Sequence, residues 1–239
     1  MLVATLLALQ AAPAARDARD LTDFLAGAWN DAEAAYFAEP PRSPGHVLIE
    51  GARDGLTVSG DVPGLHGIAV TADEGTVRVM TSGGRAPCAL TATRVGEVFR
   101  LAADGACPGT HPALVAADTL ALSDGTVMRR ADPYLCWVSR KKDASGAEGW
   151  TWAPDLALRE GETAVLPDEA GVSRPVALRL RHVRWPAGRN RDSLVLYVHD
   201  DPAAPAISYA WTAPDAERIA INLRWVQASC TRAAEETGE

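Results

Sequence analysis

Short runs in which apolar and polar residues alternate recur along the chain from residue 46 onward. Examples are His46–Glu50, Thr76–Met80, Ala89–Thr93 and Val98–Ala102. Because successive side chains of a β-strand point to opposite faces, this alternation is typical of strands with one buried and one exposed face. Asp-Gly, Gly-Gly and Val-Gly-Glu turns separate the runs, as in antiparallel hairpins. The pattern predicts a mostly β protein built as an antiparallel barrel or sandwich.

The second half of the chain contains longer and more apolar segments. We expect strands over residues 175–185, 193–199, 206–211 and 218–230. Both faces of the segment 193–199 are apolar, so this strand should be central in its sheet. An exposed loop is predicted over residues 140–149, which are rich in Gly and charged side chains. The sequence leaves open whether residues 150–230 form a second β lobe or continue the sheet system of residues 16–139.

Two short helices are expected near the N-terminus. Asp20 can cap a helix that carries Leu21, Phe24 and Leu25, and Gly27 then ends it. A second helix can begin after Asp31 and run through Phe37, before Pro40 and Pro41 stop it.

Residues 1–15 form an apolar run that ends in small residues, as a secretory signal peptide does. We expect cleavage after Ala14 or Ala15, although no Lys or Arg precedes the run. The alternative is a buried N-terminal helix. No segment reaches the roughly 20 apolar residues that cross a bilayer, so an integral membrane protein is not expected. The protein is predicted to be periplasmic or secreted, with a flexible tail over residues 231–239.

The cysteine count is even, and no two cysteines have the spacing of a redox or zinc motif. Four cysteines allow three pairings. We prefer Cys88 with Cys107, because they flank an expected hairpin, and Cys136 with Cys230, because this bridge ties the last strand to the middle of the chain. Disulfides fit an oxidising compartment. The alternative is four buried thiols, which requires a reducing compartment.

Charge and motifs exclude several classes of function. The net charge of -8 and the pI near 5.2 argue against nucleic-acid binding, which needs a basic surface. The chain has no nucleophile elbow, zinc-protease motif or phosphate-binding glycine loop. Its five histidines are scattered, and His182 and His199 on neighbouring strands are better read as sheet residues than as ligands. No metal site, no cofactor and no defined catalytic residue is therefore predicted.

Tryptophan and arginine are concentrated in the second half of the chain, which holds six of the seven tryptophans. Indoles stack on ligands and guanidinium groups bind anions, so the two together favour a recognition surface. In the strand around residue 180, Arg179 and Arg181 share one face, whereas Leu178, Leu180 and His182 share the other. The alternative is that the tryptophans fill the core and the arginines are solvated. The predicted ligand-binding residues are Trp150, Trp152, Arg179, Arg181, Trp185 and Trp211.

The stretch Leu25-Ala-Gly-Ala-Trp29-Asn30 resembles the opening of lipocalin-like (calycin) barrels, and more particularly that of bilin (chromophore) lyases of the CpcT/CpeT type. Residues 88–99 with Cys88, then Gly105-Ala-Cys107 and residues 120–125, are similar to that family's cysteine-bearing strand, glycine turn, second cysteine and next strand. The resemblance covers about residues 20–135. It implies a barrel with a cavity, and a lyase if the protein is an enzyme. Ala32 and Glu33 stand where that family has a glutamine.

Three functions remain open from the sequence. The first is an exported soluble binding protein that holds a small, partly apolar or anionic ligand in a barrel mouth or in a cleft between the lobes. The second is a chromophore lyase-like protein, and the third is a structural or interaction protein of the cell envelope. The first is preferred, and the expected partner is a small molecule.

Overall fold

The computed structural model describes residues 2–40, 42–83, 86–185 and 188–234, and their side chains from residue 13 onward. The chain divides into two compact units, Met1–Arg130 (unit 1) and Ala131–Glu239 (unit 2). The division lies before the predicted loop at 140–149, because the strand that leads into this loop pairs only within unit 2. Each unit is described by itself.

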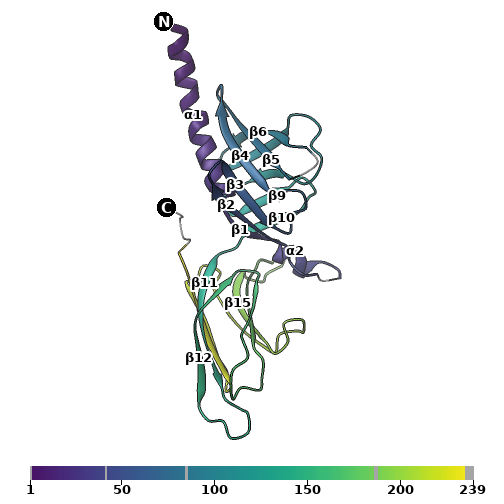
Figure 1. Cartoon of the computed structure of the whole chain (residues 1–239), viewed down its shortest axis with the longest axis vertical. Coiled ribbons are helices and arrows are strands. Elements are labelled where there is room, and N and C mark those ends of the chain that lie inside the picture. Colours follow the sequence, from purple (N-terminus) through teal and green to yellow (C-terminus); the bar gives the residue numbers. More distant parts are fainter. Residues whose placement is uncertain (1, 41, 84–85, 186–187, 235–239) are drawn as a thin grey trace. The chain divides into compact units, whose positions relative to one another are not determined.

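Unit 1 is a closed antiparallel barrel (Figure 1), as the alternating runs predicted. Its strands follow the order of the sequence, and β1 closes the barrel by pairing with both β2 and β10. The strands are β1 (Gly27–Asn30), β2 (His46–Ala52), β3 (Gly55–Gly60), β4 (Gly67–Asp73), β5 (Thr76–Ser82), β6 (Cys88–Val95), β7 (Val98–Ala103), β8 (Pro112–Val115), β9 (Thr119–Leu122) and β10 (Val127–Arg130).

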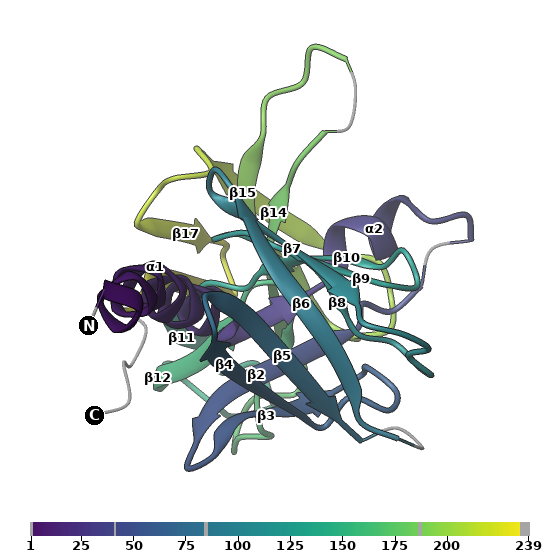
Figure 2. The same ribbon diagram turned by 90° about the horizontal axis from the view of Figure 1, so that it is seen from above.

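Helix α1 (Leu2–Leu25) contributes to the core of the barrel. Its buried Ala14, Ala18, Leu21 and Leu25 belong to one apolar cluster with residues from most barrel strands. The helix contacts β4, β5 and β8, and Figure 2 shows it end-on beside the barrel strands. Within the described residues, no helix is long and apolar enough to cross a membrane.

The helix prediction is corrected at Asp20, which lies inside α1 rather than at its start. Its carboxylate and that of Asp17 accept hydrogen bonds from Arg94 at the end of β6, at 2.5 and 3.0 Å. A second helix, α2 (Ala32–Phe37), is present as predicted. Asp31 does not cap it with its side chain, because its carboxylate accepts hydrogen bonds from Gly45 and Arg42 instead.

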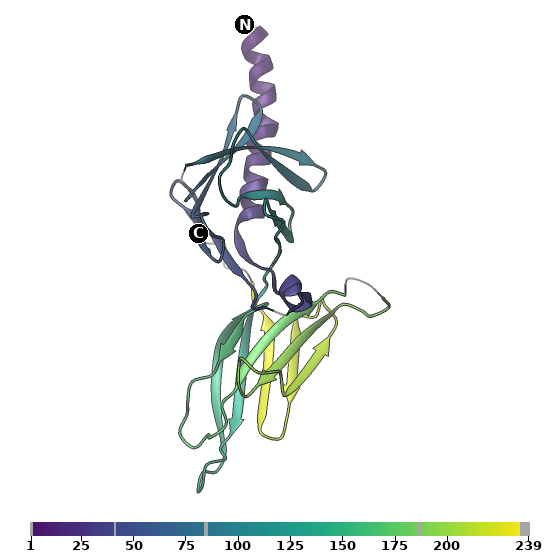
Figure 3. The same ribbon diagram turned by 90° about the vertical axis from the view of Figure 1, so that its right-hand side faces the viewer.

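Unit 2 consists of two four-stranded antiparallel sheets. We call the sheet with the order β12-β11-β18-β17 the disulfide sheet, and the sheet with the order β13-β14-β15-β16 the arginine sheet. In Figure 3 the green strands of the arginine sheet lie in front of the teal and yellow strands of the disulfide sheet. The strands are β11 (Pro133–Lys141), β12 (Trp150–Arg159), β13 (Thr163–Val165), β14 (Ala177–Val183), β15 (Ser193–His199), β16 (Ser208–Thr212), β17 (Arg218–Asn222) and β18 (Val226–Arg232).

The inner faces of the two sheets share one apolar core. Leu178, Leu180 and Leu196 of the arginine sheet pack in the same cluster as Cys136 and Cys230 of the disulfide sheet. As predicted, β15 is central, between β14 and β16. The expected single strand over residues 218–230 is corrected to two strands, because Leu223 N–H donates to the Val226 carbonyl (2.8 Å) and turns the chain between β17 and β18.

Both preferred disulfides are confirmed. Cys88–Cys107 joins the start of β6 to the loop after β7, so it closes the predicted hairpin. Cys136–Cys230 joins directly opposed residues of neighbouring strands β11 and β18 on the buried face of the disulfide sheet.

Candidate functional site

The six residues predicted to bind a ligand lie on different parts of unit 2. Trp150 and Trp152 belong to β12 of the disulfide sheet, whereas Arg179, Arg181 and Trp211 belong to β14 and β16 of the arginine sheet. Trp185 follows β14 by two residues. Because the inner faces of the sheets meet in the core, their outer faces point away from each other. The structure therefore separates Trp150 and Trp152 from Arg179, Arg181 and Trp211.

The outer face of the arginine sheet carries one of these groups. Arg179 and Arg181 lie on the face opposite the core residues Leu178 and Leu180, as the alternation predicted. Arg181 is opposite Val195, which is opposite the exposed Trp211. Two residues along the same strands, Arg179 is opposite Tyr197, which is opposite Tyr209. The rings of these two tyrosines are 6.2 Å apart. Arg181 is buried, so this face is not simply a set of solvated arginines.

The outer face of the disulfide sheet carries a set of indoles that we call the tryptophan face, formed by Trp137, Trp150 and Trp152. The rings of Trp137 and Trp152 are stacked, with centroids 5.1 Å apart and planes at 20°. Trp152 is 58% and Trp150 is 42% exposed. Leu135, on the same face of β11, is also exposed. Three indoles and a leucine thus lie next to one another with apolar surface open to solvent.

A β-bulge accounts for the position of Trp137. Cys136 is opposite Leu156 and Val138 is opposite Ala153, so Trp137 faces two residues of β12 instead of one. One of these two, Asp155, has a φ of 55°, a left-handed conformation that aspartate adopts more readily than most residues. Bulges change the direction of the side chains beside them. The bulge therefore sets how β11 and β12 present their indoles to each other.

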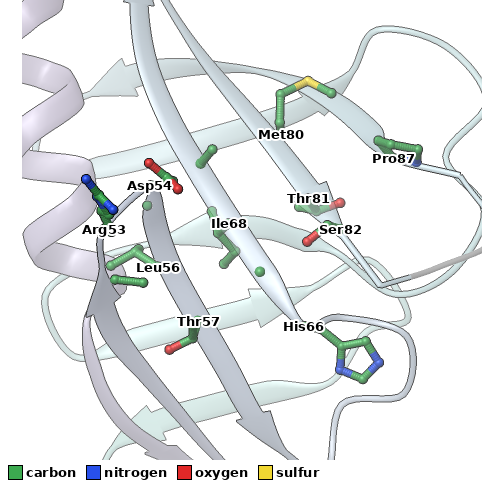
Figure 4. A pocket seen from close by; sticks show the side chains of 14 residues that line it. Arg53, Asp54, Leu56, Thr57, His66, Ile68, Met80, Thr81, Ser82 and Pro87 are labelled. Carbon is green, nitrogen blue, oxygen red and sulfur yellow. The ribbon is translucent and has the colours of Figure 1, made fainter.

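Unit 1 offers a second candidate, an open hollow on the barrel of about 490 Å³. Small residues of the adjacent strands, Gly55, Gly67 and Ala69, lie along it. Figure 4 shows Arg53 and Asp54 at one side of the hollow and His66 at the opposite side. The interior of the barrel, in contrast, is occupied by its own apolar side chains and those of α1.

A buried charged cluster lies at the end of the unit 2 sandwich. Ligand atoms of Asp132, Glu160 and His182 lie within 4.8 Å of one another, the arrangement that a metal ion could use. Guanidinium groups are close by, with Arg232 3.2 Å from Asp132 and Arg184 4.0 Å from Glu160. These positive charges oppose a cation, so we interpret the cluster as an ion-pair network.

His182 is held in this cluster through both ring nitrogens. Its Nδ1 lies 3.2 Å from a Glu160 carboxylate oxygen and its Nε2 lies 2.6 Å from the Pro214 carbonyl. Burial alone lowers the pKa of His182, but the hydrogen bond and charge of Glu160 and the Pro214 carbonyl outweigh it. The pKa of His182 is therefore raised above its usual value.

This raised pKa predicts the sign of a pH effect on unit 2. The protonated imidazole is favoured in the folded state, so its stabilisation is complete below the unfolded pKa of about 6.5. It is lost as the pH rises through the higher folded pKa. Urea unfolding between neutral and alkaline pH should show a falling stability of unit 2, with a flatter profile in His182→Gln. The matched control is His111→Gln in unit 1, and an equal slope in His182→Gln and the native protein would contradict the assignment.

Sequence reasoning missed two features of the site. It did not include Trp137, and it did not predict that the chosen residues lie on the outer faces of two different sheets. Trp137 directly follows Cys136, so the buried cysteine could have indicated that its neighbour points outward.

Comparison of the chain with protein-family models, curated proteins and solved structures found no match.

Proposed function

We propose that the protein is an exported binding protein that holds a small, partly apolar ligand on the tryptophan face. The observation that carries this proposal is the stacked and exposed pair Trp137 and Trp152, with Trp150 beside it. Indoles of this kind are usually buried, because burying a large aromatic side chain removes 150–250 Å² from water. A contiguous exposed apolar patch commonly marks a binding site.

The tryptophan face is suited to binding because its groups are already arranged. The Trp137–Trp152 stack fixes two indoles against each other, so little side-chain freedom is lost when a flat ligand is added. Each aromatic contact contributes about 0.5–1.5 kcal/mol beyond the area that it buries. The core-filled barrel favours this surface over a ligand inside the barrel.

Export is supported by the two disulfides, which favour an oxidising compartment. The proposed removal of residues 1–15 is compatible with the barrel core, because Ala18, Leu21 and Leu25 would remain and, among the core side chains that the structure describes, only Ala14 would be lost. Asp17 and Asp20, which bind Arg94, would also remain. We also propose that the protein is periplasmic or secreted and that residues 20–135 are related to lipocalin-like barrels.

Anilinonaphthalene sulfonate, a planar apolar anion whose emission rises on apolar surfaces, tests the site. The native protein should enhance its emission, and Trp152→Ala should remove most of this enhancement because one side of the stack is lost. The matched control is Trp211→Ala, which removes a still more exposed indole from the arginine sheet.

The two variants distinguish the two faces. Loss of emission in Trp211→Ala with no change in Trp152→Ala would place the probe on the arginine sheet and contradict the proposal. So would an emission that neither substitution changes.

A further inference from the structure

A polar row continues from the tryptophan face across the whole disulfide sheet. Trp152 is opposite Ser139, Ser139 is opposite Gln227, and Gln227 is opposite Asn222. These four residues lie on the outer face, since the residues next to them, such as Val138, Ala228 and Ile221, belong to the core. The row therefore runs perpendicular to the strands, from β12 to β17, with an indole at one end and two amides at the other.

The side chains of this row differ in how far they are engaged within the protein. Ser139 is buried and donates its hydroxyl hydrogen bond to the Thr151 carbonyl at 2.8 Å, so this hydroxyl is already engaged within the protein. Gln227 is half-buried and Asn222 is exposed. Over the ranges that the structure describes, neither of these two amide side chains hydrogen-bonds to another residue of the protein. Their donors and acceptors face solvent and are available to a ligand.

We propose that this row binds a neutral, extended oligosaccharide that crosses the strands, an inference that rests on the proposed function of the tryptophan face. A pyranose ring has an apolar face of C–H groups, which stacks on an indole, and a rim of hydroxyls. A side-chain amide offers two donors and an acceptor, which match neighbouring hydroxyl groups. The row has no charged side chain, which favours a neutral sugar over an anion.

The dimensions of the row agree with a short sugar chain. Neighbouring strands are about 4.7–4.9 Å apart, so Trp152 and Asn222 are separated by about 14 Å. One strand spacing is close to the length of one ring in an extended oligosaccharide. An extended chain would thus place one ring on the Trp152 indole and later rings over Gln227 and Asn222. A chain that curves would leave this row after the first ring.

Calorimetric titration of the whole protein with cellohexaose and maltohexaose tests this geometry, since both are glucose hexamers but only cellohexaose is an extended ribbon. Cellohexaose should bind at least about tenfold more tightly than maltohexaose. Trp152→Ala should weaken its binding more than tenfold. Gln227→Ala and Asn222→Ala should each weaken it about 2- to 12-fold, as expected for one neutral hydrogen bond. The control Thr231→Ala, on the same face but outside the row, should leave the affinity unchanged.

Sugar binding and probe binding together distinguish a failure of the oligosaccharide inference from a failure of the proposed function. If neither hexasaccharide binds while anilinonaphthalene sulfonate still binds through Trp152, the oligosaccharide inference is overturned and the proposed function stands. If neither the sugars nor the probe depend on Trp152, both are overturned. Sedimentation of the same variants detects a different occupant: self-association that Trp152→Ala abolishes would assign the face to a second copy of the chain and would also overturn the inference.

Discussion

Replacement of Trp29 by alanine should lower the free energy of unfolding of the barrel by about 3–5 kcal/mol, the range for large aromatic side chains in a core. Trp29 is 1% exposed, and its Nε1 donates to the Leu25 carbonyl at 2.9 Å. The Arg130 guanidinium lies 4.6 Å from its ring centroid and donates to the carbonyls of Ala26 and Phe24. Because Trp29 and Arg130 are directly opposite in β1 and β10, this contact lies where the barrel closes.

The loss in Trp29→Ala should be confined to unit 1. Urea unfolding followed by hydrogen-exchange mass spectrometry reads peptides of the two units separately. The matched control is Trp152→Ala, which removes the same side chain from an exposed position and should cost less than about 1.5 kcal/mol in unit 2. Equal losses in the two variants would show that Trp29 does not hold the barrel closed.

Removal of the Cys136–Cys230 bridge should be the largest single loss of stability in unit 2. The two cysteines are 94 residues apart. In the chain-entropy model a loop of about 100 residues gains about 4.7 kcal/mol from its cross-link. The bridge joins neighbouring strands of the disulfide sheet within the core, so the double variant Cys136→Ala, Cys230→Ala should unfold at a much lower urea concentration.

The second disulfide provides the control for this prediction. Cys88 and Cys107 are only 19 residues apart, and a loop of that size gains about 3 kcal/mol. The double variant Cys88→Ala, Cys107→Ala should therefore lose less stability, and the loss should appear in unit 1. A larger loss in this variant than in the Cys136 and Cys230 variant would contradict the loop-length argument.

The strands that the sequence revealed are those with long alternation. The segments at 46–50, 76–80, 89–93 and 98–102 all lie within strands of the barrel. Strands such as β1, β8 and β9 are only four residues long, too short for a periodic signal. β12 is long but contains Pro154 and the bulge, which interrupt its alternation. These four strands form by pairing with residues distant in the sequence, and the local sequence pattern carries no information on that pairing.

The candidate site was predictable only in its residue types. The concentration of tryptophan in the second half indicated a recognition surface, and Trp150 and Trp152 lie on it. The separation of these two from Arg179 and Arg181 follows from which sheet each strand joins, and that is decided by the crossings from β12 to β13 and from β16 to β17. Nor could sequence spacing place Gln227 and Asn222 in one row with Trp152, since this row depends on strand register.

The proposed function requires that a ligand binds on the tryptophan face of the disulfide sheet. The most direct measurement is a proton–nitrogen correlation spectrum of the seven indole N–H groups during titration with anilinonaphthalene sulfonate. The resonances of Trp137, Trp150 and Trp152 should shift together and saturate, while that of the buried Trp29 stays fixed. Shifts confined to Trp185 and Trp211, with these three unchanged, would contradict it.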